Sequence, residues 1–176
     1  MPAVSDAGPL IHLAQVGRLN LLKQIFGKVT IVRSVKHEVV DEGIRLSHPD
    51  AVLVKNAMVE GWITVVTPTS RLLRRAKRLA RQEKLSLSDS QTLLVAKTLT
   101  QSLLTDEKPL SILGRMYGLG VWNTWTVLLE ALRAGFIGKV EIHAAINELG
   151  QKRHKLSARR AEEILRIADR LAPSDT

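Results

Sequence analysis

Short apolar runs alternate with longer stretches of helical periodicity along this chain of 176 residues. The apolar runs, rich in β-branched residues, predict five strands at 3–5, 29–32, 62–66, 102–105 and within 118–123. Strands that alternate with helices in this way favour an α/β sandwich with a parallel sheet. No internal repeat or low-complexity segment interrupts the pattern.

The segments between the strands carry apolar residues three and four positions apart, which predicts amphipathic helices. These helices cover 8–26 (two short helices with a break at Gly17), begin at Ser34 and His48, and then cover 71–84, 85–99, 108–118, 124–137, 138–150 and 157–171. Ser47, three residues before Asp50, is expected to cap the helix that follows it. The last two helices form a predicted extension, residues 138–176, packed on the same domain.

Two sets of residues in this pattern concern possible surfaces of the protein. Four early leucines at helical spacing fit either the core or a face between two copies of the chain, and the core is the default for such residues. They are Leu10, Leu13, Leu21 and Leu22. The helix over 71–84 has an apolar stripe with its cations on the opposite side.

Composition narrows the class of protein. The chain has no cysteine, which excludes a disulfide scaffold, a zinc site built on thiolates and a cysteine nucleophile. Its apolar runs are too short to span a membrane, and its first residues lack the pattern of a signal peptide. Aromatic residues make up only 3%, too few for a platform that stacks unpaired bases. We therefore expect a soluble, cytoplasmic protein with no membrane partner.

The formal net charge of +9 is concentrated in two stretches. Residues 71–84 hold seven basic residues and one acid, and residues 151–160 hold five basic residues and no acid. The rest of the chain is slightly acidic. Two basic patches on such a body fit a polyanionic partner, and the alternative is that both are solvated helix faces.

Two predicted strands end in an aspartate, Asp6 and Asp106. The carboxyl ends of parallel strands share one edge of a sheet, so these side chains are expected to converge. Close carboxylates repel one another and are normally neutralised by a divalent cation or by protonation. Oxygen ligands without cysteine or clustered histidine favour Mg²⁺ or Mn²⁺ over Zn²⁺. The alternative is that each aspartate only caps the turn after it.

Two further acids are candidates for the same edge. Glu38 lies one turn into the helix after the second strand, and its alternative role is that of a solvated acid beside Asp41 and Glu42. Asp89 follows Ser86 by three residues, which is also a capping arrangement. The five histidines lack metal-ligand spacing and are not expected to bind a metal. They are His12, His37, His48, His143 and His154.

Four segments in order resemble PIN domains, above all bacterial and archaeal toxins of the VapC type. The segments are VSDAGPLIHLAQVGRLNLL, VTIVRSVKHEV, LSLSDSQTLLVA and LLTDEKPL, and the resemblance covers residues 3 to 136. It implies a PIN-like three-layer α/β/α sandwich with a central parallel sheet, and an acidic cluster that binds Mg²⁺ or Mn²⁺ and cleaves RNA. Residues 1–137 are accordingly expected to form a PIN-like nuclease domain.

The resemblance assigns the catalytic and metal-binding acids by motif. They are Asp6, Glu38, Asp89 and Asp106, with Glu107 as an alternative for the fourth. Many relatives carry hydroxyl residues directly after the first aspartate, where this chain has Ala7 and Gly8. Ser5 or Thr105 is the candidate substitute for that hydroxyl.

The expected function is that of a metal-dependent endoribonuclease, since carboxylate-bound Mg²⁺ or Mn²⁺ activates water and stabilises charge on a scissile phosphate. RNA phosphates are expected to contact Arg78, Arg81 and Lys84 of the basic helix. The resemblance adds the role of toxin in a toxin–antitoxin pair, with an antitoxin and a second copy of the chain as partners. The alternative function is a non-catalytic nucleic-acid-binding or protein-interaction module on a PIN-like scaffold.

Overall fold

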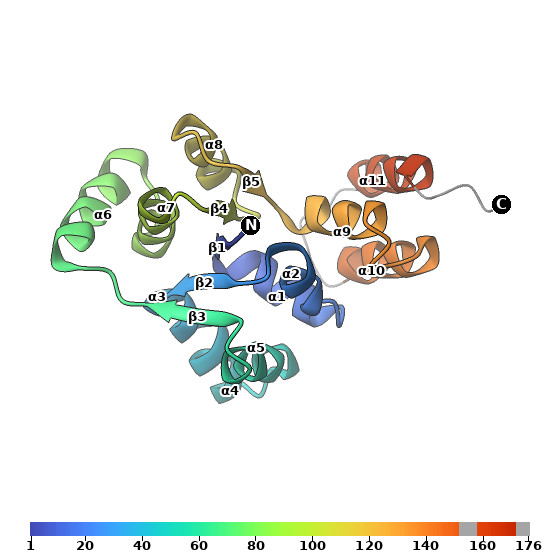
Figure 1. Cartoon of the computed structure of the whole chain (residues 1–176), viewed down its shortest axis with the longest axis horizontal. Coiled ribbons are helices and arrows are strands. Elements are labelled where there is room, and N and C mark those ends of the chain that lie inside the picture. The colour runs from blue at the N-terminus through green and yellow to red at the C-terminus, as the bar shows by residue number, and fades with distance from the viewer. Residues whose placement is uncertain (152–157, 172–176) are drawn as a thin grey trace.

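The computed structural model describes residues 1–151 and 158–171. Its centre is one five-stranded sheet, and every neighbouring pair of strands is parallel. The spatial order is β3-β2-β1-β4-β5, as Figure 1 shows. The strands are β1 (Ala3–Ser5), β2 (Val29–Val32), β3 (Ile63–Val66), β4 (Ser102–Leu104) and β5 (Val121–Trp122). The predicted α/β sandwich with a parallel sheet is therefore confirmed.

Helices fill every connection between the strands. They are α1 (Ala7–Gln15), α2 (Asn20–Phe26), α3 (Arg33–Lys36), the π-helical η1 (His37–Glu42), α4 (Gly43–Arg45), α5 (Pro49–Val59), α6 (Ser70–Glu83), α7 (Leu87–Leu99), α8 (Lys108–Met116), α9 (Thr124–Arg133), α10 (Lys139–Gln151) and α11 (Ala158–Leu171). The predicted helices are confirmed, and the one expected from Ser34 is divided into α3, η1 and α4.

The order of the strands explains the three layers. The chain passes from β1 to β2 and β3 in one direction across the sheet, and from β3 to β4 and β5 in the other. Because parallel crossovers are right-handed, this reversal puts the connecting helices on opposite faces. Figure 1 shows α7 and α8 on one side of the sheet and α1, α2 and α5 on the other. The reversal occurs between β1 and β4, where ligands bind in folds of this type.

The core continues from the sheet into both helical layers. Every residue of β1 and β4 is buried, and so are seven consecutive residues of α7, from Ser90 to Ala96. Leu10, Leu13, Leu21 and Leu22 are all at most 4% exposed. The interpretation of these leucines as core residues is confirmed, so they do not form a face between two copies.

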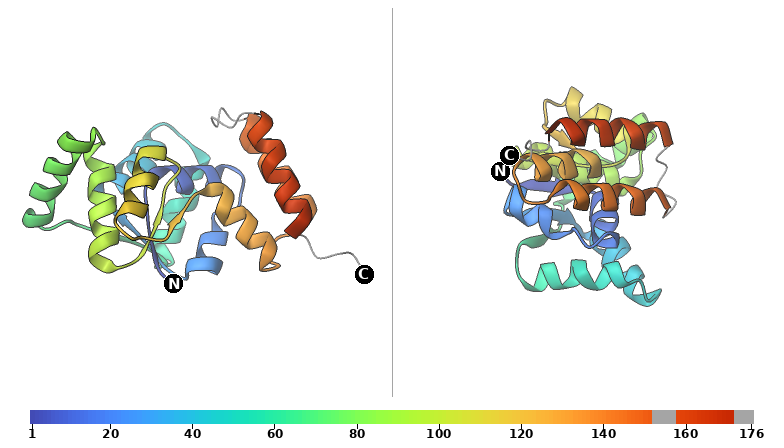
Figure 2. Two further views of the ribbon diagram at one scale, coloured as in Figure 1. Left: turned by 90° about the horizontal axis from the view of Figure 1, so that it is seen from above. Right: turned by 90° about the vertical axis from the view of Figure 1, so that its right-hand side faces the viewer.

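Helices α10 and α11 pack on α9, at the end of the molecule opposite α6 (Figures 1 and 2). Their buried residues Ile142, Ile146, Ile164 and Ala168 belong to the same hydrophobic cluster as the sheet. No helix among the described residues is long and apolar enough to cross a membrane. Most of the second basic stretch, including His154, lies outside the described residues.

One predicted cap is wrong. The residue at the N-cap of α5 is His48, and no side chain caps this helix. Ser47 instead has a φ of 58°, in the left-handed region, and closes the turn after α4 through its backbone N–H to Ile44. Ser47, which the sequence pattern predicts as a cap, belongs instead to the turn between α4 and α5. Helix α5 begins at Pro49 without a side-chain cap.

Candidate functional site

Asp6 lies at the point where β1 ends and α1 begins. Its backbone N–H continues the pairing with β4 by donating to the carbonyl of Leu104 at 3.0 Å. Its Oδ1 accepts from the backbone N–H of Gly8 at 3.0 Å and so caps α1. Its Oδ2 accepts from the hydroxyl of Thr105. Asp6 is thus both a helix cap and a carboxylate held in place from the neighbouring strand.

Asp106 is held on three sides at the end of β4. The backbone N–H of Thr124 donates to its Oδ1 at 2.8 Å, and the Thr124 hydroxyl donates to its Oδ2 at 2.6 Å. The Nδ1 atom of His12 lies 2.7 Å from the same Oδ2. The N-terminus of α9 and the middle of α1 therefore fix this carboxylate. Glu107, the other candidate, is exposed and occupies the N-cap position of α8.

Gly8 separates the two aspartates. A Cβ atom on residue 8 would lie 3.3 Å from both Cβ and Oδ2 of Asp106, and 3.5 Å from Oδ1 of Asp6. One carboxylate oxygen of each aspartate thus lies next to Gly8, and a side chain at this position would crowd both. Gly8 departs from the pattern of PIN domains, and its closeness to both aspartates explains why this chain has no side chain there.

Burial and like charge act on Asp6 together. It is only 3% exposed, and this desolvation raises its pKa well above the ordinary value. The negative charges of Asp106 and Asp89 raise the pKa further, against the hydrogen bonds from Thr105 and Gly8 that lower it. A buried carboxyl with two acidic neighbours favours either a proton or a cation at this position.

Asp89 connects Asp6 with Glu38 by its charge. Its backbone N–H donates to the Ser86 hydroxyl at 2.9 Å, so the capping interpretation of Ser86 is confirmed. Glu38 lies on η1 and is exposed, yet partial desolvation of its carboxyl group and the charge of Asp89 raise its pKa. A π-helical turn of this kind is frequent at functional sites.

A polar cluster joins the helices that carry these two acids. The hydroxyls of Ser34 and Ser88 lie 2.9 Å apart, and the Ser34 hydroxyl also donates to Oε1 of Gln91 at 3.3 Å. Ser34 belongs to α3, directly before η1, whereas Ser88 and Gln91 belong to α7. These hydrogen bonds therefore hold α3, which leads into the helix of Glu38, against α7, which carries Asp89.

The four acids do not yet form a compact ligand set. Asp6 and Asp106 lie beside Gly8, while the charge of Asp89 acts on Asp6 and, separately, on Glu38. Across residues 1–151 and 158–171, no three histidine, aspartate or glutamate side chains are grouped closely enough to hold a metal ion as they stand.

His12 and Thr124 were not expected at the site. The spacing of His12 predicts no metal binding, and nothing in it indicates a contact with a residue 94 positions away. Thr124 follows the last short strand at a helix start, a position from which a hydroxyl residue often binds a carboxylate or a backbone group. That position is the signal that could have indicated Thr124.

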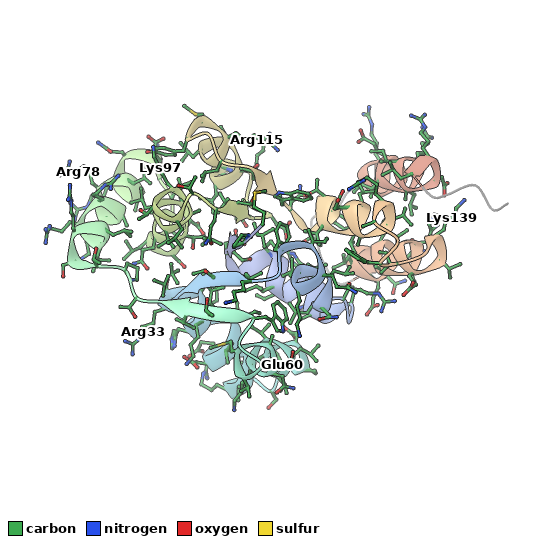
Figure 3. All side chains as sticks on the ribbon, in the orientation of Figure 1. Arg33, Glu60, Arg78, Lys97, Arg115 and Lys139 are labelled. Atoms are coloured by element: carbon green, nitrogen blue, oxygen red, sulfur yellow. The ribbon has the colours of Figure 1, made fainter. Side chains whose placement is uncertain are left out.

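The basic helix α6 directly precedes, in the sequence, the helix that carries Asp89. Arg78 and Arg81 are exposed on α6, and Arg78 points away from the sheet in Figure 3. Lys84, exposed and in the left-handed conformation, ends α6 two residues before Ser86. The C-terminal end of α6 therefore leads directly to the turn that carries Asp89.

Comparison with known proteins agrees with this architecture. The structure resembles the crystal structure of PAE2754 from Pyrobaculum aerophilum, with a TM-score of 0.52 and 19% sequence identity. The alignment covers 74% of this chain and 97% of that one, and at this identity it shows the fold alone. A search of curated proteins found no match. The family model of DUF3368, a PIN domain, matches residues 2–170, and the chain therefore belongs to this family of PIN domains.

Proposed function

We propose that this protein is a metal-dependent endoribonuclease whose active site contains Asp6 and Asp106, with Asp89 and Glu38. PIN domains are generally nucleases that act on nucleic acids, and they usually use divalent metal ions. The observation that carries the proposal is the buried carboxyl of Asp6 beside Asp106, at the reversal of the strand order. Such a position is the expected ligand site of an open parallel sheet.

The donor set fits a hard cation. Asp6 and Asp106 bring two carboxylates together beside Gly8, and an all-oxygen donor set suits Mg²⁺ or Mn²⁺ better than Zn²⁺. These two residues would hold the ion, and Asp89 and Glu38 would complete its surroundings. When bound, such an ion supplies water activated near neutral pH and stabilises charge on the phosphate.

The other polar residues of the site act on the two aspartates. Thr105 orients Asp6, while Thr124 and His12 orient Asp106 through Oδ2, the oxygen that lies nearest Gly8. Partners of this kind fix the direction of ligand oxygens and raise metal affinity. The chain thereby replaces the hydroxyl that relatives carry after the first aspartate.

The test is cleavage of a mixed RNA pool by the full chain with Mg²⁺, with Mn²⁺ and with a chelator. We expect cleavage with either metal and none with the chelator. Asp6→Asn and Asp106→Asn should each lower the rate by about 100-fold or more, because even residues behind the ligands change activity by roughly 10–100-fold. Asp169→Asn on α11, an exposed acid far from the site in sequence, is the matched control.

Three results would contradict the proposal: cleavage in the presence of chelator, equal activity in all three variants, or no cleavage under any condition. The last result, combined with intact RNA binding, would favour the alternative of a non-catalytic module on the PIN scaffold.

The role of toxin in a cytoplasmic toxin–antitoxin pair belongs to the same proposal and rests on the resemblance of the four motifs. It predicts that induced expression stops bacterial growth and that Asp6→Asn relieves the arrest. Normal growth with the wild-type chain at equal protein level would remove the toxin, and with it the antitoxin, from the proposal.

A further inference from the structure

Helix α6 carries an unusual concentration of positive charge. It lies at one end of the molecule and packs mainly against α7, with Ala76 and Leu79 as its buried residues (Figure 1). Its exposed cations are Arg71, Arg74, Arg75, Lys77, Arg78 and Arg81, and its only acid is Glu83. The packing therefore uses the apolar stripe and leaves the cations in solvent.

The cations of α6 have no acidic partner among the described residues. No ion pair in that part of the chain includes a cation of α6, whereas six cations outside it are paired, among them Arg18, Lys23 and Lys139. Like charges four positions apart, such as Arg74 with Arg78 and Lys77 with Arg81, destabilise a helix. An external polyanion would remove this repulsion.

The cations surround a shallow hollow of about 380 Å³, and none of its lining residues is acidic. The lining consists of Arg74, Lys77, Arg78, Arg81 and Gln82. The comparable hollow on α11 mixes the two signs of charge, since Glu162 and Glu163 lie among its arginines. The seven helical steps from Arg74 to Arg81 extend over about 10 Å, enough for two or three successive phosphates.

The chemistry of this face favours a phosphate backbone over other anionic partners. No aromatic residue lies on α6, Leu79 is buried, Leu72 packs on the core, and no leucine lines the hollow, so the cationic face has no residue that would insert into a lipid surface. It also lacks the apolar anchor that a protein partner needs at the centre of an interface. Cations alone bind phosphates without reading sequence.

We propose that the α6 face of Arg74, Lys77, Arg78 and Arg81, continued by Lys84, binds the phosphate backbone of single-stranded RNA and directs it toward Asp89. The direction toward Asp89 rests on the proposed nuclease function, whereas binding does not. Of the three cations expected from the sequence, Arg78 and Arg81 line the hollow, and Lys84 is the C-cap residue of α6, two residues before Ser86.

The experiment measures binding of fluorescein-labelled 20-nucleotide RNAs of several sequences by anisotropy, in chelator, between 50 and 200 mM salt. The test variant is Arg74→Gln with Arg78→Gln and Arg81→Gln. The matched control is Arg159→Gln with Arg166→Gln and Arg170→Gln on α11, which removes the same charge from the mixed face. Both triplets spare buried residues, and glutamine preserves the helix.

We expect the α6 variant to bind every RNA about tenfold more weakly or worse at 0.1 M salt. Its salt slope should fall by about two, at roughly 0.7 for each lost contact with a single strand. The α11 variant should keep the wild-type slope. Circular dichroism must show that all three proteins are folded.

Equal losses in both variants would overturn the proposal, because net charge alone would then explain binding. An unchanged slope in the α6 variant would show that the face is only solvated. Displacement of RNA by polyglutamate at equal charge would also overturn it, in favour of an acidic protein partner. Because chelator prevents metal-dependent cleavage, binding without any later cleavage supports the α6 face and contradicts only the nuclease function.

Discussion

Asp6 shows how one residue satisfies a structural and a chemical requirement together. One oxygen caps α1, and the other accepts from Thr105 on the neighbouring strand. From the sequence, the hydroxyl group that binds the Asp6 carboxylate could belong to either Ser5 or Thr105. The structure decides for Thr105, whose hydroxyl donates to the Asp6 carboxylate, whereas the Ser5 hydroxyl donates to the backbone carbonyl of Asp6.

The raised pKa of Asp6 predicts a dependence of stability on pH in the metal-free protein. As pH rises above the ordinary pKa of aspartate, the unfolded chain loses this proton while the folded chain keeps it. The free energy of unfolding therefore falls until pH passes the folded pKa. Asp6→Asn should remove this fall and be more stable than the wild type at neutral pH. Urea unfolding in chelator from pH 4 to 8 measures both.

The control for this pH series is Asp169→Asn. Lys139 and His143 lower the pKa of Asp169, so this exposed group acts in the opposite direction. Its removal should leave the fall of the wild type in place. A pH profile of Asp6→Asn that parallels the wild type would contradict the assignment of the effect to Asp6.

The substitution Gly8→Ala is expected to favour helix α1 but to weaken metal binding by the two aspartates. Alanine is the better helix former by about 1 kcal/mol, but its Cβ would press on both aspartates at 3.3–3.5 Å. We expect a folded protein in which Mn²⁺ raises the melting temperature less than in the wild type, because the space between the carboxylates is filled. Differential scanning fluorimetry with and without Mn²⁺ measures this, and an undiminished shift would contradict it.

At the scale of elements, strand and helix positions follow from the sequence but the contacts between distant helices do not. The apolar runs predicted all five strands because buried parallel strands are short and apolar. His12 and Thr124 reach Asp106 from α1 and α9, which only the folded order of strands brings beside β4. Periodicity describes the face of each helix and carries no information on its partner across the sheet.

The hydrogen bond from the Thr124 hydroxyl at the N-terminus of α9 predicts that valine and serine at this position have different effects. Thr124→Val removes the hydroxyl that donates to Asp106 but leaves the backbone N–H and the Asn123 cap. Unfolding should become easier by about 1–3 kcal/mol, the cost of a lost hydrogen bond to a buried charged group, and the response to Mn²⁺ should decrease. Thr124→Ser keeps the donor and should resemble the wild type in both measurements. Equal behaviour of the two variants would contradict a role for the hydroxyl.

At the scale of the whole molecule, the reversal of strand order separates three regions. Helix α6 lies at one end of the molecule and α10 and α11 at the other, with the sheet between them (Figure 2). Asp6 and Asp106 follow β1 and β4, the two strands between which the order reverses. The family match extends from residue 2 to 170 and so includes both α10 and α11. The predicted division at residues 137 and 138 remains a prediction, and a stability measurement can test whether the extension folds with the rest.

Ile146→Ala and Val140→Ala on α10 provide that test. Ile146 is fully buried in the cluster shared with the sheet, whereas Val140 is 82% exposed. If the extension and the sheet unfold together, Ile146→Ala should lower the free energy of unfolding by about 2–4 kcal/mol in one cooperative transition. Val140→Ala should change it by less than about 0.5 kcal/mol. A second, earlier transition for Ile146→Ala, with the main one unmoved, would show that the C-terminal helices unfold independently of residues 1–137.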